Sequence, residues 1–82
     1  DDGTEHALDR EHLRKELDLV LEQLQPAYRE VLVLFFYEEL SYKEIALILK
    51  IPVSSVGVRI ARAKKRAYEL IEQHHTHLHE YH

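Results

Sequence analysis

Hydrophobic residues recur at three- and four-residue spacing through the first third of the chain. This period is that of an amphipathic α-helix, and the positions are Leu13, Leu17, Val20, Leu21 and Leu24. The spacing predicts a helix over about residues 8–24, which Gln25-Pro26 interrupts. Pro26 suits the first position of a following helix, because its missing N–H would have no partner there in any case. The polar, acidic residues 1–7 are expected to be disordered.

The next segment, about residues 26–38, is hydrophobic on nearly all sides. Its apolar residues are too many for one helical face: Val31, Leu32, Leu34, Phe35 and Phe36. A helix of this kind lies at the centre of a core. Val, Phe and Tyr also favour β-sheets, so a strand is the alternative. A helix is preferred because no second strand is predicted nearby to pair with it.

Two further helices follow, separated by a short break. Ser41 and Glu44 have the S-x-x-E spacing of a capping box, which predicts a helix over 42–49 with Ile45, Ala46 and Leu49 facing inward. Pro52 disfavours helical geometry at the residue before it. A long helix is then predicted over about 53–72, with a buried stripe of Val53, Val56, Ile60, Ala63, Ala67, Leu70 and Ile71. The prediction is one all-α, four-helix domain over residues 8–73, followed by a His-rich tail, 74–82, that frays.

The composition narrows the classes of function. The 82 residues are enough for one small domain. The absence of cysteine excludes disulfides, thiolate catalysis and cysteine zinc sites, and it fits the reducing cytoplasm in which we expect the protein. No apolar run approaches the roughly 20 residues of a membrane span, and the acidic start is unlike a signal peptide.

The titratable and hydroxyl side chains do not form a catalytic pattern. Ser41, Ser54 and Ser55 have no partnered histidine in their sequence context, so we expect no enzyme activity and no cofactor. His75 and His79 are spaced i, i+4, which can bind zinc on a helix. A weak adventitious site is the preferred interpretation, and no metal site is predicted.

Charge is unevenly distributed along the chain, although the net charge is only −4. Residues 1–40 contain eleven Asp/Glu and four Lys/Arg, a balance of −7, whereas residues 41–82 contain four Asp/Glu and seven Lys/Arg, a balance of +3. Five of those seven basic residues lie between Arg59 and Arg66. Such a run is often only a solvated face, but its position after two short-linked helices favours contact with phosphates.

The third and fourth predicted helices, with the short turn between them, form a helix-turn-helix pattern. Ala46 is small enough to let the second helix cross closely, and the angle between the helices is filled by Leu49, Ile51, Val56 and Ile60. The outer face of the second helix would then enter the major groove. An ordinary helical hairpin in a bundle is the alternative.

A longer pattern is more specific. The stretch "LQPAYREVLVLFFYEELSYKEIALILKIPVSSVGVRIARAKKRAYELI" resembles region 4 of bacterial sigma factors, particularly the extracytoplasmic-function group. The matching residues are Leu24, Pro26, Arg29, Val31, Leu34, Leu40, Ser41, Glu44, Ile45, Ala46, Leu49, Ile51, Pro52, Val56, Arg59, Arg62 and Ala63. Gln25, between Leu24 and Pro26, departs from the family spacing. The resemblance implies a winged-helix-like fold without a wing.

The resemblance also implies function and partners. Such a domain docks on the minus-35 element of double-stranded promoter DNA, contacts the β-subunit flap of the RNA polymerase core, and can be bound by an anti-sigma factor; we expect a monomer. By position, the candidate phosphate contacts are Ser41, Tyr42, Lys43 and Ser55, joined by Arg59 and Arg66 of the basic run. The candidate groove-facing residues are Ser54, Gly57, Val58, Ala61, Arg62 and Lys65.

Helical geometry supports most of this set. At about 100° per residue, with Val56 buried, the opposite face is centred near Ser54, Val58, Ala61, Arg62 and Lys65. Gly57, Ser55 and Arg59 then lie on its flanks.

The sequence departs from the family at the positions that matter for reading bases. Lys50 replaces the glycine of the turn, where a side chain is strained. Gly57 stands where Lys or Arg is common and costs a helix roughly 1 kcal/mol relative to Ala, which suggests close approach of the backbone to DNA or to a protein. Val58 and Ala61 can contact thymine methyl groups, and Arg62 is the best candidate for guanine.

Two other functions remain open from the sequence. One is a sigma-like module that binds polymerase or an anti-sigma partner without DNA, which Gly57, Val58 and the negative net charge favour. The other is a response-regulator output domain of similar layout. A complete sigma factor also has a region 2, for which 82 residues are too few, so we expect a fragment or one subunit of a split factor.

Overall fold

The computed structural model describes the backbone of residues 2–80 and the side chains of residues 10–76. Most of these residues lie in four α-helices. In chain order the elements are α1 (Asp2–Val20), the 3₁₀ turn η1 (Leu21–Gln23), α2 (Pro26–Leu32), the π-helical turn η2 (Val33–Tyr37), α3 (Tyr42–Leu49) and α4 (Val53–Glu80). No residue of 2–80 is in a strand, so the strand alternative for the hydrophobic run is wrong and the all-α prediction is confirmed.

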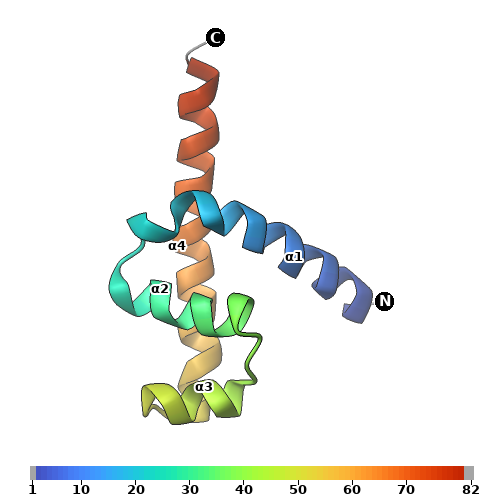
Figure 1. Cartoon of the computed structure of the whole chain (residues 1–82), viewed down its shortest axis with the longest axis vertical. Helices are drawn as coiled ribbons and strands as arrows, with labels where there is room; N and C mark the ends of the chain where they lie inside the picture. Colours follow the sequence, from blue (N-terminus) through green and yellow to red (C-terminus); the bar gives the residue numbers. More distant parts are fainter. Residues whose placement is uncertain (1, 81–82) are drawn as a thin grey trace.

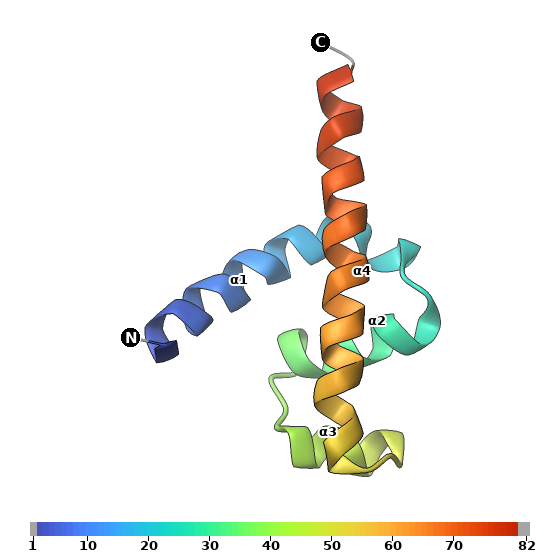
Figure 2. The same cartoon turned by 180° about the vertical axis from the view of Figure 1, so that it is seen from behind.

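Helix α4 is the central element of the domain, because α1, α2 and α3 all pack against it. It runs the length of the molecule, and α1, α2 and α3 cross it one after another on the same side (Figure 1). Seen from behind, α4 passes in front of the other helices with nothing over it (Figure 2). The functional consequence is that one side of α4 holds the fold together while the other is open to a partner.

The core lies between α4 and the three crossing helices. It consists of Leu13, Leu17, Val20, Leu24, Val31, Leu32, Phe36, Ile45, Ala46, Val56, Ile60, Ala63, Ala67, Leu70 and Ile71. Most residues of the predicted buried stripes are therefore confirmed as core, although Leu21 and Leu49 are only partly buried. Val53 is 46% exposed, because it is the first residue of α4 and precedes the turn that packs against α3.

The helix ends differ from those predicted. Helix α1 begins at Asp2, where disorder was expected over 1–7, and α4 continues to Glu80 instead of fraying from residue 74. Residues 4–7 and 74–80 contain no proline or glycine that would stop a helix. At its other end α1 stops at Val20, and the 3₁₀ turn η1 follows. Gln25 is extended (φ −65°, ψ 152°), as expected for the residue before a proline.

The second predicted helix, 26–38, is not regular. Its α-helical part ends at Leu32, and η2 follows with a wider π-type turn. Five consecutive apolar or aromatic residues, Val33–Tyr37, cannot share one face at the α-helical period, and the wider turn buries Phe36 while leaving its neighbours partly exposed. Glu39 then turns the chain with a positive φ of 57°.

The helix-turn-helix is fixed by local hydrogen bonds at both ends of α3. The predicted capping box is present: the Glu44 N–H donates to Ser41 Oγ at 3.1 Å, and the Ser41 N–H donates to Glu44 Oε1 at 2.8 Å. At the other end Lys50 is left-handed (φ 59°, ψ 46°), and the Ile51 N–H donates to the Ala46 carbonyl at 3.1 Å. This closure sends the chain directly into α4.

Lys50→Gly is expected to stabilise the domain modestly. The left-handed conformation costs a side chain about 1–2 kcal/mol, whereas glycine loses about 0.5–1 kcal/mol through the entropy of the unfolded chain. The free energy of unfolding should therefore rise by up to about 1 kcal/mol, measured by urea denaturation. Lys43→Gly, at an exposed position in the first turn of α3, is the control and should destabilise. A destabilised Lys50→Gly variant would contradict the strain argument.

Helix α1 is tied to η2 by polar and aromatic contacts as well as by the core. The Arg10 guanidinium lies 4.2 Å from the centre of the Phe35 ring and donates to the Phe35 carbonyl at 3.1 Å. The Tyr37 hydroxyl donates to Asp18. Burial and this hydrogen bond raise the pKa of Tyr37 to about 12, against the lowering effect of Arg14.

The raised pKa of Tyr37 predicts a loss of stability at high pH. In the unfolded chain a tyrosine ionises near its ordinary pKa of about 10, while folded Tyr37 stays neutral to about 12. The stabilising contribution is therefore complete below pH 10 and is lost as the pH rises from 10 through 12. Tyr37→Phe should show a shallower fall in urea midpoint between about pH 9 and pH 11 than the unaltered protein. Tyr68→Phe, at an exposed tyrosine, is the control; equal slopes for Tyr37→Phe and the unaltered protein would refute the prediction.

Candidate nucleic-acid interface

The uncovered side of α4 carries the residues predicted to face the groove. Ser54, Val58, Ala61, Arg62 and Lys65 are all exposed, and Val58 retains 50% of its surface. Ser55, Gly57 and Arg59 are half-buried, as expected on the flanks of that face. The helical geometry inferred from the sequence therefore matches the folded chain.

The N-terminal ends of α3 and α4 lie at the same end of the molecule (Figures 1 and 2). Ser41, Tyr42 and Lys43 are exposed at the start of α3. Ser41 already accepts the Glu44 N–H, so its hydroxyl proton is free to be donated to a phosphate. Helix α4 starts after Pro52. The proline side chain cannot accept a hydrogen bond from the first N–H groups of the helix, so these N–H groups can bind an anion.

Gly57 is close to α3, which the sequence did not indicate. A Cβ atom at Gly57 would lie 3.3 Å from Tyr42 Cε2 and 3.9 Å from its hydroxyl oxygen. Gly57 does not have a positive φ, so its backbone would accept another residue. The close approach that the glycine permits is therefore an approach of Tyr42 within the domain.

A second aromatic residue, Tyr28 of α2, lies on the other flank of α4. It lines an open pocket of about 320 Å³ together with Ser54, Ser55, Val58, Arg59 and Arg62. Five of these six residues were predicted from the sequence; Tyr28 was missed because its position depends on how α2 crosses α4. Tyr28 is half-buried and forms the part of this pocket that α2 contributes.

The basic residues of α4 are not equivalent. Arg66 Nη1 is 3.0 Å from Glu69 Oε1, an exposed i, i+3 ion pair. Within residues 10–76 no ion pair involves Arg59, Arg62 or Lys65. Glu69 therefore competes with a phosphate for the Arg66 guanidinium, whereas Arg59, Arg62 and Lys65 have no such competitor within residues 10–76.

Of the five tail histidines, the structure describes the side chains of His74 and His75. Within residues 10–76, no group of three or more His, Asp or Glu side chains could hold a metal ion. His75 Nε2 instead lies 3.2 Å from Glu16 Oε1, which joins α4 to α1; the side chain of His79 lies outside the described residues. Of the helices described, none is both long enough and apolar enough to cross a membrane.

The capped α3, the tight left-handed turn and the uncovered basic face of α4 define a helix-turn-helix DNA-binding domain. The family described as "Sigma-70, region 4" matches residues 14–66, well over half of the chain, and the chain belongs to this family. Members are DNA-binding regulatory domains rather than enzymes; they recognise the minus-35 element in transcription initiation and bind RNA polymerase. No curated protein and no solved structure matches the chain.

Proposed function

We propose that this domain binds the minus-35 element of a promoter with α4 in the major groove. The observation that carries the proposal is the side of α4 that no other helix covers (Figure 2). Five residues of α4 predicted to face that side are exposed: Ser54, Val58, Ala61, Arg62 and Lys65. Arg62 pairs with guanine, and the methyl groups of Val58 and Ala61 contact thymine. Recognition of this kind depends on few hydrogen bonds to bases.

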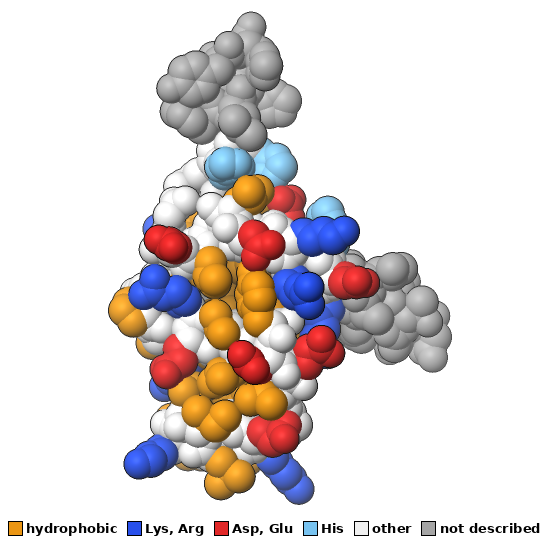
Figure 3. All heavy atoms as spheres, viewed as in Figure 1, with side chains coloured by type: hydrophobic (Ala, Val, Ile, Leu, Met, Phe, Trp, Pro, Cys, Tyr) orange, Lys and Arg blue, Asp and Glu red, His pale blue; other side chains and the backbone are white. Residues whose placement is uncertain are grey.

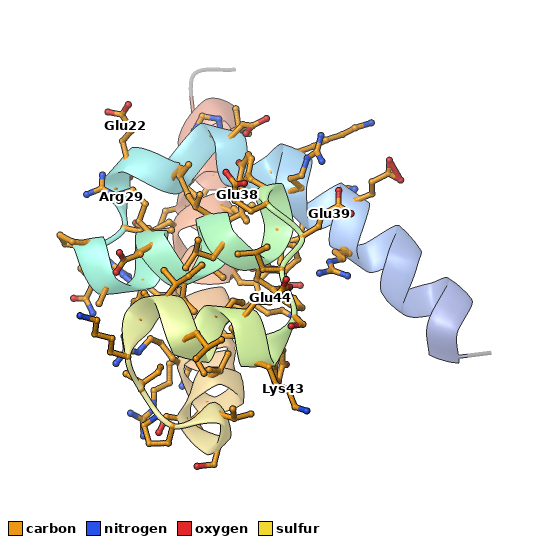
Figure 4. The ribbon with its side chains drawn as sticks, turned by 60° about the horizontal axis from the view of Figure 1, so that its bottom comes forward. Glu22, Arg29, Glu38, Glu39, Lys43 and Glu44 are labelled. Atoms are coloured by element: carbon orange, nitrogen blue, oxygen red, sulfur yellow. The ribbon has the colours of Figure 1, made fainter. Side chains whose placement is uncertain are left out.

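Phosphate contacts position α4 in the groove. From α3 they come from Ser41, Tyr42 and Lys43, and from α4 they come from Ser55, Arg59 and Arg66. Figure 4 shows Lys43 pointing away from the domain, with Glu39 and Glu44 on the same side of the picture. Because these carboxylates repel phosphates, they offset part of the attraction of Lys43 for the DNA backbone.

The face opposite the DNA surface suits a protein partner. Hydrophobic side chains run down the middle of the side formed by α1, α2 and α3, with acidic and basic groups around them (Figure 3). Leu19 on α1 and Leu47 and Ile48 on α3 are exposed hydrophobic residues, and Leu47 retains 79% of its surface. We assign this side to the polymerase β flap, or to an anti-sigma factor that competes for it, with the domain acting as a monomer.

A titration of labelled promoter duplexes tests the DNA-binding function. If about four cationic side chains neutralise phosphates, raising the salt from about 50 to about 200 mM should weaken binding roughly 150-fold. Duplexes selected from a random pool should share a sequence, with thymines opposite Val58 and Ala61. A scrambled duplex of equal length is the control, and equal affinity for both would contradict sequence reading.

The exposed hydrophobic side also supports the second candidate, a module that binds polymerase or an anti-sigma factor without DNA. The same titration decides between the two functions. Absence of duplex binding at low salt, together with binding to the isolated polymerase flap, would establish the interaction module and overturn the first proposal. The match to the sigma family leaves the response-regulator alternative without support.

A further inference from the structure

Gly57 is unusual because neither its backbone nor its exposure requires a glycine. It lies inside α4 without a positive φ, and a side chain at this flank position would have been able to reach DNA. A Cβ at residue 57 would meet the tip of Tyr42, with Cε2, the hydroxyl oxygen and Cζ at 3.3, 3.9 and 4.0 Å, so that the ring would have to shift by a few tenths of an ångström. A real Cβ rarely has a neighbour as close as 3.3 Å.

The Tyr42 ring is held in this place from its other side. The Phe35 ring centre lies 5.8 Å from that of Tyr42, with the planes at 61°, an edge-to-face arrangement that aromatic pairs favour. Phe35 is itself fixed by the Phe36 ring at 5.0 Å and by the Arg10 guanidinium at 4.2 Å. A Tyr42 ring that moved away from α4 would therefore lose its edge-to-face contact with Phe35.

The hydroxyl group of Tyr42 remains available to an outside partner. Tyr42 is 42% exposed, and no side-chain hydrogen bond within residues 10–76 involves its hydroxyl. Residue 57 is at the flank of the exposed side of α4, next to Ala61 one turn further on. A group at this edge faces the wall of the major groove, where the phosphates are.

We propose that Gly57 and Tyr42 act as one DNA-contacting unit, in which Tyr42 supplies from α3 the contact that a side chain at residue 57 would otherwise supply from α4. The Tyr42 hydroxyl donates a hydrogen bond to a phosphate oxygen, and Gly57 leaves the space that its ring needs. This inference rests on the proposed function. It also predicts that the basic side chain common in the family at residue 57 would be harmful in this chain, because it would displace Tyr42.

The test compares duplex affinity among five proteins: the unaltered domain, Tyr42→Phe, Gly57→Lys, Tyr42→Ala and the double variant Tyr42→Ala with Gly57→Lys. Tyr42→Phe keeps the ring and its packing, and should weaken binding roughly 2- to 12-fold, the range of one hydrogen bond. Because the lost group is neutral, its salt dependence should not change. Gly57→Lys should weaken binding although it adds a positive charge.

The effect of Gly57→Lys on duplex affinity should change sign in a protein that lacks the Tyr42 ring. In the Tyr42→Ala background, Gly57→Lys should strengthen binding and steepen the salt dependence by about 0.9 in log–log slope, the value for one new phosphate contact. Thermal unfolding of every variant, followed by circular dichroism, confirms that each is folded at the temperature of the titration.

Each result decides one of the two proposals. Stronger binding by Gly57→Lys alone, or unchanged binding by Tyr42→Phe, would overturn the paired contact while leaving the proposed function intact. Failure of the unaltered domain to bind duplex would overturn the proposed function and the paired contact with it.

Discussion

Arg62→Ala is expected to weaken binding to the selected promoter duplex by roughly 5- to 150-fold, the range for loss of a bidentate arginine–guanine contact. Arg62 is exposed on the uncovered side of α4 and has no ion-pair partner within residues 10–76. Its guanidinium is therefore not engaged before DNA arrives. The loss should be accompanied by relaxed preference at one base pair, measured by competition with duplexes substituted at each position.

Arg66→Ala is the matched control, because it removes the same charge from the same helix. Arg66 is paired with Glu69 at 3.0 Å, so its release for a phosphate offsets part of what it contributes. We expect a smaller loss of affinity, uniform across sequences. An Arg62→Ala variant that loses affinity equally for all duplexes would place Arg62 on the phosphate backbone and refute its role in base recognition.

Leu17→Ala is expected to lower the free energy of unfolding by about 2–5 kcal/mol. Leu17 is fully buried where α1 crosses α4, and removal of its methyl groups leaves a cavity between two helices. A domain of this size has a total stability of about 4–12 kcal/mol. The variant should therefore lose a large share of its stability, and urea denaturation measures the change.

Leu19→Ala removes the same atoms two residues later in α1. Leu19 is 49% exposed, so this variant should differ from the unaltered domain by less than about 0.5 kcal/mol. Equal stability of both variants would show that α1 is not an integral part of the fold. Duplex affinity of the folded fraction should be unchanged in either variant, since α1 does not reach the uncovered side of α4 (Figure 2).

Most of the fold could be predicted because its signals are local. The period of the hydrophobic residues identified the core stripes, and the spacing of Ser41 and Glu44 identified the start of α3, where both capping hydrogen bonds form. Pro26 and Pro52 marked where helices begin. These features depend on neighbours within one or two turns, which the sequence shows directly.

The irregular parts could not be predicted, because they depend on packing. The π-type turn of η2 depends on how its aromatic residues pack against α3 and α1. Glu39 is left-handed although it is neither glycine nor asparagine, so its type does not predict this conformation. The helical ends at Asp2 and Glu80 were missed because a polar, acidic or His-rich composition is compatible with either helix or coil.

The candidate site likewise has one part that the sequence predicts and one part that only the fold shows. The outward direction of Val58, Ala61 and Arg62 follows from helical geometry alone, but the contact between Gly57 and Tyr42 joins residues from two helices. The glycine was taken to indicate a close approach to DNA or to another protein, which stays a prediction; the close group that the fold shows is Tyr42 of the same chain. DNA contact by the predicted residues remains a prediction that the titrations test.

The separation of the two sides of α4 has a consequence for how promoter preference can change during evolution. Because the helices that build the core pack on one side of α4, the proposed function implies that substitutions at Val58, Ala61 or Arg62 alter the preferred bases with little risk of unfolding. New specificities are therefore reachable by single steps. Residue 57 is the exception, because a side chain there would press against Tyr42. The proposed paired contact therefore implies that a favourable change at residue 57 also needs a change at residue 42.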